Sequence, residues 1–151
     1  MNIDRHSRNQ LAEAIRALAS GLITNDEFER KRMPHNMSDP AVNEVFSSGA
    51  WCLYSDLKAY RLTGKQKLDG PTRKEIARWV LFLKTDLPYE WPVPTFQESF
   101  FRFFGNLFTF GRFNRRYQNE IALLGDTEVW PFLRRSDFEA ALRDPKYLNA
   151  I

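Results

Sequence analysis

The side chains best suited to chemistry in this sequence are aromatic and basic ones that gather in a single stretch. Eight of the 13 Phe residues lie between positions 96 and 113. Positions 99 to 119 hold four Arg residues and no Asp or Glu, a charge of +4, while the whole chain has a charge of +3. Rings interleaved with basic groups can stack on bases and neutralise phosphates, or they can bury apolar surface against another protein.

The basic end of this stretch is the candidate interaction surface. Read as a helix from Thr95 to about Thr109, the stretch is apolar except for one narrow stripe, so most of its rings are expected in the core. The candidate residues lie where rings and arginines are closest together, and they are Phe108, Phe110, Arg112, Phe113, Arg115 and Arg116. Because four arginines neutralise few phosphates, nucleic-acid binding through residues 99–119 would be weak and salt-sensitive. We therefore favour a partner protein or a second copy of the chain over nucleic acid.

A second group of aromatic residues lies in two proline-bounded segments, around the pairs Trp91-Pro92 and Trp130-Pro131. Tryptophans in such loops usually fold back over the edge of the core. If they converge, they could instead line a pocket for an apolar or proline-rich ligand. The residues of this possible aromatic pocket are Tyr89, Trp91, Trp130 and Phe132.

Residues suited to catalysis are few and scattered. The glycine spacing of a phosphate-binding loop, the nucleophile elbow and the His-Glu-x-x-His helix are missing from the sequence. Cys52 lies in an apolar helical stretch and is expected in the core, and His6 and His35 are expected to be bystanders. Two His and one Cys give no zinc-type ligand set, so we expect neither a metal nor a cofactor, and a metal site built on carboxylates alone is the alternative. A small enzyme would need carboxylates that meet only in space, such as Asp56, Asp86, Asp126 and Glu128.

Helices must position these side chains, and the first two form a hairpin. One helical face is predicted by apolar residues at Leu11, Ile15, Leu18 and Leu22. Gly21 is well placed to end that helix in a left-handed conformation. Thr24 and Glu27 then form a capping box for a second helix, and Ile23 can pack on Phe28 as a hydrophobic staple.

Further helix starts follow along the chain. The Ser/Thr-x-x-Glu signal recurs at Thr72, Thr95 and Ser136, and Asp39 before Pro40 marks a start of another kind. Helical spacing also links Leu53, Leu57 and Tyr60, and then Ile76, Trp79, Val80 and Leu83. No segment alternates like a half-buried strand. The sequence therefore predicts an all-α, single-domain irregular bundle of seven or eight helices, with residues 1–33 as the hairpin and 34–151 as the bundle, in one folding unit.

Residues 11–31 resemble the short C-terminal (SHOCT) domain. The matching residues are Leu11, Ile15, Leu18, Gly21-Leu22-Ile23-Thr24, Glu27-Phe28 and Lys31. The resemblance implies a helical hairpin that takes part in oligomerisation.

Composition limits the remaining possibilities. A chain of 151 residues with 43% hydrophobic and 27% charged residues suits one globular domain. The single cysteine allows no internal disulfide, and no uncharged stretch approaches the roughly 20 residues that span a bilayer. The first residues lack the apolar core of a signal peptide, so we expect a cytoplasmic protein. The favoured function is a non-enzymatic protein-interaction or regulatory module that forms a homodimer through the hairpin or the Phe-rich surface.

Overall fold

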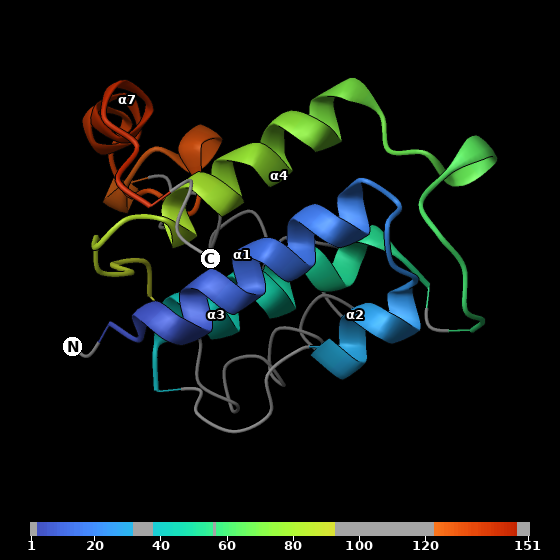
Figure 1. Ribbon diagram of the computed structural model, residues 1–151. Helices are drawn as coiled ribbons and strands as arrows, with labels where there is room; N and C mark the ends of the chain where they lie inside the picture. The colour runs from blue at the N-terminus through green and yellow to red at the C-terminus, as the bar shows by residue number, and fades with distance from the viewer. Residues whose placement is uncertain (1–2, 32–37, 56, 93–122, 148–151) are drawn as a thin grey trace, which may run out of the picture.

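A computed structural model describes residues 3–31, 38–55, 57–92 and 123–147, and these parts of the chain are mainly helical (Figure 1). The α-helices are α1 (Arg5–Ala19), α2 (Asn25–Lys31), α3 (Pro40–Glu44), α4 (Gly70–Leu83) and α7 (Arg135–Arg143). A π-helical turn, η1 (Val45–Gly49), continues α3, and three 3-10 turns follow, η2 (Ala50–Leu53), η3 (Gly64–Gln66) and η4 (Thr127–Val129). The described residues form no sheet, and Thr24 and Arg61 make an isolated bridge.

The all-α prediction is confirmed, but the predicted number of helices is not. The described ranges hold five α-helices where the whole chain was expected to have seven or eight. One reason is that the pattern at Leu53, Leu57 and Tyr60 is not helical. Asn25 holds this segment as a loop, because its Nδ2 donates to the Ser55 and Lys58 carbonyls at 2.9 and 3.0 Å and its Oδ1 accepts from the Tyr60 N–H at 2.8 Å. Leu57 is 90% exposed there.

The hairpin forms as its local signals predict. Thr24 Oγ1 accepts from the Glu27 N–H at 3.1 Å, and Glu27 Oε2 accepts from the Thr24 N–H at 2.8 Å, so the capping box closes in both directions. Ile23 and Phe28 are buried in one cluster. Gly21 has a φ of +72°, which favours glycine, and a Cβ there would meet Thr63 Cγ2 at 2.4 Å unless the exposed Thr63 side chain moved.

Two other predicted helix starts are displaced. At α4 the cap is Asp69, whose carboxylate accepts from the Thr72 N–H at 2.8 Å, so this helix begins earlier than the Thr72 box implied. At α7 the residue before the helix is Arg134, which makes no side-chain cap, and the Ser136 box falls inside the helix. The start at Asp39 is confirmed, because its side chain accepts from the Ala41 N–H at 3.0 Å. The start at Thr95 lies outside the described residues.

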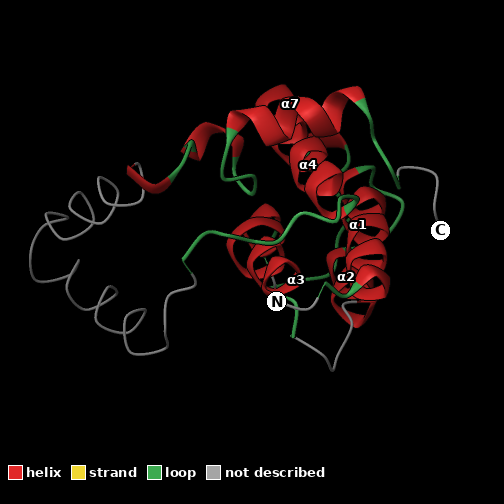
Figure 2. Cartoon of the chain, turned by 90° about the vertical axis from the view of Figure 1, so that its left-hand side faces the viewer, coloured by secondary structure: helices red, strands yellow, loops and turns green. Residues whose placement is uncertain are grey.

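Two buried clusters hold the helices together. The larger one joins α1, α2 and η1 to the face of α4 that carries Ile76, Trp79, Val80 and Leu83. The smaller one joins Leu81 and Phe82 on α4 to α3, α7 and the segments around Tyr89 and Phe132. Because the N-terminal end of α1 contacts the C-terminal end of α4, these two helices run antiparallel along each other. Figure 2 shows α4 between α7 on one side and α1 on the other. Residues 79–83 of α4 are buried, whereas five of the six residues from Gly70 to Glu75 are exposed.

Candidate functional site

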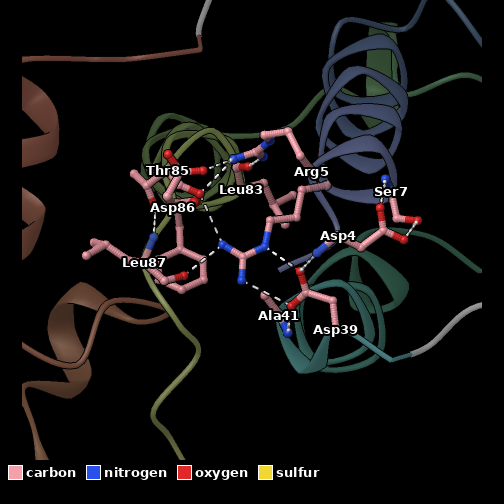
Figure 3. A network of polar contacts seen from close by, with 11 residues as sticks. Asp4, Arg5, Ser7, Asp39, Ala41, Leu83, Thr85, Asp86 and Leu87 are labelled. Atoms are coloured by element: carbon pink, nitrogen blue, oxygen red, sulfur yellow. Dashed lines mark hydrogen bonds and ion pairs between the residues drawn. The ribbon is translucent and has the colours of Figure 1, made fainter. Parts of the chain in front are cut away.

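Buried charges at the N-terminal end of α1 join three helices in one network (Figure 3). Arg8 and Asp39 are each 1% exposed, and Arg8 Nε and Nη2 lie 2.6 and 3.1 Å from the two oxygens of Asp39. Arg8 Nη1 also donates to the carbonyls of Thr85 and Leu87 at 3.1 and 2.8 Å. Asp39 caps α3 at the same time, through the N–H of Ala41. The pair is bidentate and closed to solvent, so it holds α1, α3 and the end of α4 together rather than facing a ligand.

Arg5 extends this network toward the C-terminal end of the described chain. Its guanidinium donates to the carbonyls of Leu83 and Thr85, lies 3.5 Å from Asp86 Oδ1 and stacks 4.7 Å from the centre of the Tyr147 ring. Tyr147 donates to Asp86 Oδ2 at 2.7 Å, and this bond raises the pKa of the Tyr147 hydroxyl. Burial lowers the pKa of Arg5. These contacts attach the segment after α7 to the start of α1.

A groove of about 830 Å³ lies along α4, between α1 and α7, where Ala77 is exposed and Ile76, Val80 and Leu81 keep only 5 to 6% of their surface exposed. On α4, Ile76 with Val80 and Ala77 with Leu81 form two rows four residues apart, which lie side by side on the helix surface. Leu142, on α7, is 56% exposed. The apolar lining residues are Ala19, Ile76, Ala77, Val80, Leu81, Phe138 and Leu142. The groove is thus a concave apolar surface.

The charged side chains of the groove are all basic. They are Arg16, Arg73, Lys74 and Arg78, and no acidic residue is among the described residues that line the groove. Arg16 lies 3.3 Å from Glu13 Oε1, and Arg78 Nε donates to the Trp130 carbonyl at 2.6 Å. Burial lowers the pKa of Arg78, while the nearby carboxylate of Glu75 raises it. The groove therefore combines an apolar floor with a positive rim.

The four residues of the predicted aromatic pocket converge in the structure. Tyr89, Trp91 and Phe132 are buried, and Trp130 is partly buried. Trp91 Nε1 donates to the Phe132 carbonyl and Trp130 Nε1 donates to the Tyr89 hydroxyl, both at 3.1 Å. Phe82 packs edge-on against Phe132, with ring centres 5.0 Å apart. This packing fits tryptophans that cover the core edge, and ligand binding at these rings stays a prediction.

The predicted interaction surface lies outside the described residues. Phe108, Phe110, Arg112, Phe113, Arg115 and Arg116 all fall within positions 93–122. Nucleic-acid binding through residues 99–119 therefore stays a prediction. A salt-dependent retardation of single-stranded DNA or RNA, abolished when the three arginines are replaced by Ala, would support it.

The carboxylates proposed for an enzyme are held by cationic partners where they are described. Arg135 pairs with both Asp126 and Glu128, at 2.8 Å from its Nε to Asp126 Oδ2 and 2.6 Å from its Nη2 to Glu128 Oε2. Both hydrogen bonds raise the pKa of Arg135, and the bond to Asp126 has the larger effect. Asp86 lies apart from them, with Arg5 and Tyr147. Burial raises the pKa of Glu44, and Ser48 partly opposes the rise with a hydrogen bond. A cleft of about 360 Å³ is lined by the carboxylates of Asp86, Asp137 and Asp144 together with Lys146, and a carboxylate-based enzyme stays a prediction.

Cys52 is exposed on η2, so the expectation that it belongs to the core is wrong. The reason is that the helix expected around it ends at Leu53, leaving the thiol on the outside of a short 3-10 turn. His6 is exposed in the first turn of α1, as expected, whereas His35 and Asp56 lie outside the described residues. Within the described ranges no three His, Cys, Asp or Glu side chains gather as metal ligands would. None of the helices described there is both long and apolar enough to cross a bilayer.

No pattern in the sequence predicted the groove. Ile76, Val80 and Leu83 were expected only to share a helix by their spacing, and they are buried. The available signal was the repetition of a basic residue at Lys74 and Arg78, one helical turn apart. That signal alone predicts an ordinary solvated face, because only the positions of α1 and α7 turn the face into a groove.

Comparisons with protein-family models, with curated proteins and with solved structures found no match for this chain. The resemblance of residues 11–31 to the SHOCT domain therefore stays a prediction.

Proposed function

We propose that this chain is a non-enzymatic protein-interaction module that binds a helix of its partner in the groove between α1, α4 and α7. The observation that supports the proposal is the apolar floor of a groove of about 830 Å³ that remains open in the described structure. A concave apolar surface of this size gains free energy when a ligand displaces its water. Arg8 and Asp39, which with Lys84 are the most deeply buried charged residues described, pair with each other and serve the fold, so this pair offers no competing catalytic site.

The shape of the groove suits a helix. Lining residues on α4 run from Arg73 to Leu81, a rise of about 12 Å, which matches roughly two turns of a bound helix. Small side chains at Ala19 and Ala77 leave room for a backbone to approach closely. Leu142 supplies an exposed apolar contact at the side of the groove. A helix with apolar residues at positions i, i+3, i+4 and i+7 could contact Ala19, Ala77 and Leu142 together.

A neutral amphipathic peptide tests this proposal. The probe is a labelled 18-residue helix, about five turns, with Leu on one face and Gln on the other. We expect saturable binding in fluorescence anisotropy, weakened about fivefold or more by Leu142→Asp, which places a charge in the apolar contact. Leu57→Asp is the matched control, because Leu57 is exposed but outside the groove. If Leu142→Asp binds the peptide as tightly as the control does, the groove is not the docking surface.

Self-association is a second candidate, favoured by a different observation. Leu22 is 68% exposed at the turn of the hairpin that resembles the SHOCT domain. A second copy could cover this side chain, and the chain would then be a dimer. Light scattering across a concentration series checks this: a dimer that Leu22→Gln converts to monomer supports the hairpin interface, and a monomer at every concentration contradicts it.

A further inference from the structure

We infer that the partner helix is acidic along the edges of its apolar face, an inference that rests on the proposed docking groove. The groove has a positive rim on an apolar floor, and its described lining contains no carboxylate. A partner helix flanked by Asp or Glu would complement both the floor and the rim. A neutral or basic helix would complement the floor only.

Two of the rim cations are available to such a partner. Arg73 and Lys74 are exposed and make no ion pair with any described residue. Arg16, at the other side of the groove, pairs with the exposed carboxylate of Glu13 at 3.3 Å and with no other carboxylate of the described ranges. Such a pair between exposed groups is weak, so a carboxylate of the partner can replace it.

The positions of these cations on α4 oppose what the helix itself favours. Arg73 and Lys74 lie near the N-terminal end of α4, where the helix dipole is positive and where this helix has no acidic residue in its first turn. Lys74 also lies four residues before Arg78, a like-charge spacing that destabilises a helix. Asp69 at the cap offsets part of this cost for Arg73, and Glu75 offsets part of it for Arg78, whereas Lys74 keeps the unfavourable position. An anionic ligand in the groove would relieve the repulsion, and the dipole adds to the attraction.

The register of these residues defines the partner further. Lys74 and Arg78 form a row beside the row of Ala77 and Leu81 on the same helix, with one turn between members. A bound helix that lies along α4 with its apolar face on Ala77 would therefore place carboxylates four residues apart next to Lys74 and Arg78. We expect an acidic pair at positions i and i+4 on the edge of the partner's apolar face.

Charge variants of the peptide test the inference separately from the groove. The probe helix is compared with Glu and with Lys in place of its flanking Gln residues, at low and at high salt. We expect the Glu form to bind about tenfold more tightly than the Lys form at low salt, with the difference shrinking as salt screens the charges. We expect the double variant Arg73→Glu, Lys74→Glu to reverse this preference. The matched control is Lys65→Glu, Lys67→Glu, which changes the same charge outside the groove.

The outcomes separate the two proposals. Equal binding of the Glu, Gln and Lys peptides, all weakened by Leu142→Asp, would overturn the acidic partner and leave the docking groove standing. Absence of binding by every peptide would overturn both. Vesicles that contain anionic lipid, offered as a third probe, would overturn the acidic helix if they bind the protein and displace the Glu peptide through Arg73 and Lys74.

Discussion

The two ends of the α1–α4 pair use positive charge in opposite ways. At one end Arg8 is enclosed, bidentate to Asp39 and bonded to two carbonyls beyond α4. At the other end Arg73 and Lys74 are exposed and have no ion-pair partner among the described residues. We call the first region the clamp, comprising Arg8 and Asp39, and the second the groove.

This difference distinguishes charges that hold a fold from charges that meet a partner. A buried ion pair is costly to break because the remaining charge stays desolvated, whereas an exposed cation is hydrated and costs little to change. Substitutions in the clamp should therefore alter stability, and substitutions in the groove should alter binding.

The largest effect is expected when the clamp loses its carboxylate. Asp39→Ala leaves Arg8 buried without its anion and uncaps α3, so we expect the free energy of unfolding to fall by about 3–5 kcal/mol. Asp69→Ala is the matched control, because Asp69 also caps a helix but its side chain is exposed, and there we expect a loss of about 1 kcal/mol.

Chemical denaturation of the two variants checks the comparison. Equal losses would mean that the clamp contributes no more than a helix cap. If Asp39→Ala does not fold, Asp39→Asn serves instead, because the amide oxygen keeps an acceptor for the Ala41 N–H while the charge and the acceptor for Arg8 Nε are lost. Circular dichroism then reports whether the helices persist when the ion pair is lost and the α3 cap remains.

An intermediate effect is expected at Glu13, which links a buried cation to the groove. Its Oε1 lies 3.0 Å from the enclosed Lys84 Nζ and 3.3 Å from Arg16 on the rim. We expect Glu13→Gln to lower the free energy of unfolding by about 1–2 kcal/mol through the Lys84 contact. Arg16→Gln removes only the exposed pair and should cost at most about 0.5 kcal/mol. If urea denaturation gives the two variants the same loss, burial of Lys84 does not matter.

The sequence predicted well what neighbouring residues decide. The Thr24–Glu27 capping box, the Asp39 cap and the left-handed Gly21 depend on contacts within a few residues, and all three are present. It failed where a distant side chain intervenes. Asn25 holds the loop that was expected to be a helix, using bonds that reach 30 to 35 residues along the chain.

The clamp and the groove were beyond sequence analysis for the same reason. Arg8 and Asp39 are 31 residues apart, and no spacing rule pairs them. The groove needs α7 beside α4, more than 50 residues later in the chain. Among these long-range features, the sequence indicated only the possible convergence of the four aromatic residues. The hydrogen bonds of Trp91 and Trp130 show that these residues do meet.

A pH-dependent effect sharpens the comparison within α3, which has Asp39 at its start and Glu44 at its end. Burial raises the pKa of Glu44, and Ser48 opposes the rise with a hydrogen bond. The Glu44 carboxyl group therefore stays protonated to a higher pH in the folded protein than in the unfolded chain. As the pH rises above the usual pKa of glutamate, ionisation of Glu44 lowers the free energy of unfolding. We expect Glu44→Gln to match the parent near pH 4 and to gain up to about 1 kcal/mol at pH 7.

Denaturation of Glu44→Gln at both pH values checks this sign. A gain that is the same at pH 4 and pH 7 would show that the amide packs better, and that titration of Glu44 plays no part. Ser48→Ala is the accompanying variant, since it removes the hydrogen bond to Glu44 Oε2, at 3.3 Å, and should enlarge the difference between the two pH values.

The smallest effect has the opposite sign to that of the clamp. Lys74→Glu replaces a cation near the positive end of the α4 dipole and converts a like-charge spacing with Arg78 into an attractive one, so we expect the free energy of unfolding to rise by about 0.5 kcal/mol. Lys65→Glu, on the exposed 3-10 turn η3, should change it by less. Thermal denaturation at low salt measures the difference, and peptide affinity is measured on the same samples. If Lys74→Glu is more stable than the parent and binds the acidic peptide more weakly, then Lys74 contributes to partner binding at a cost to the stability of the helix. A variant that loses stability would mean that Lys74, like Arg8, serves the fold.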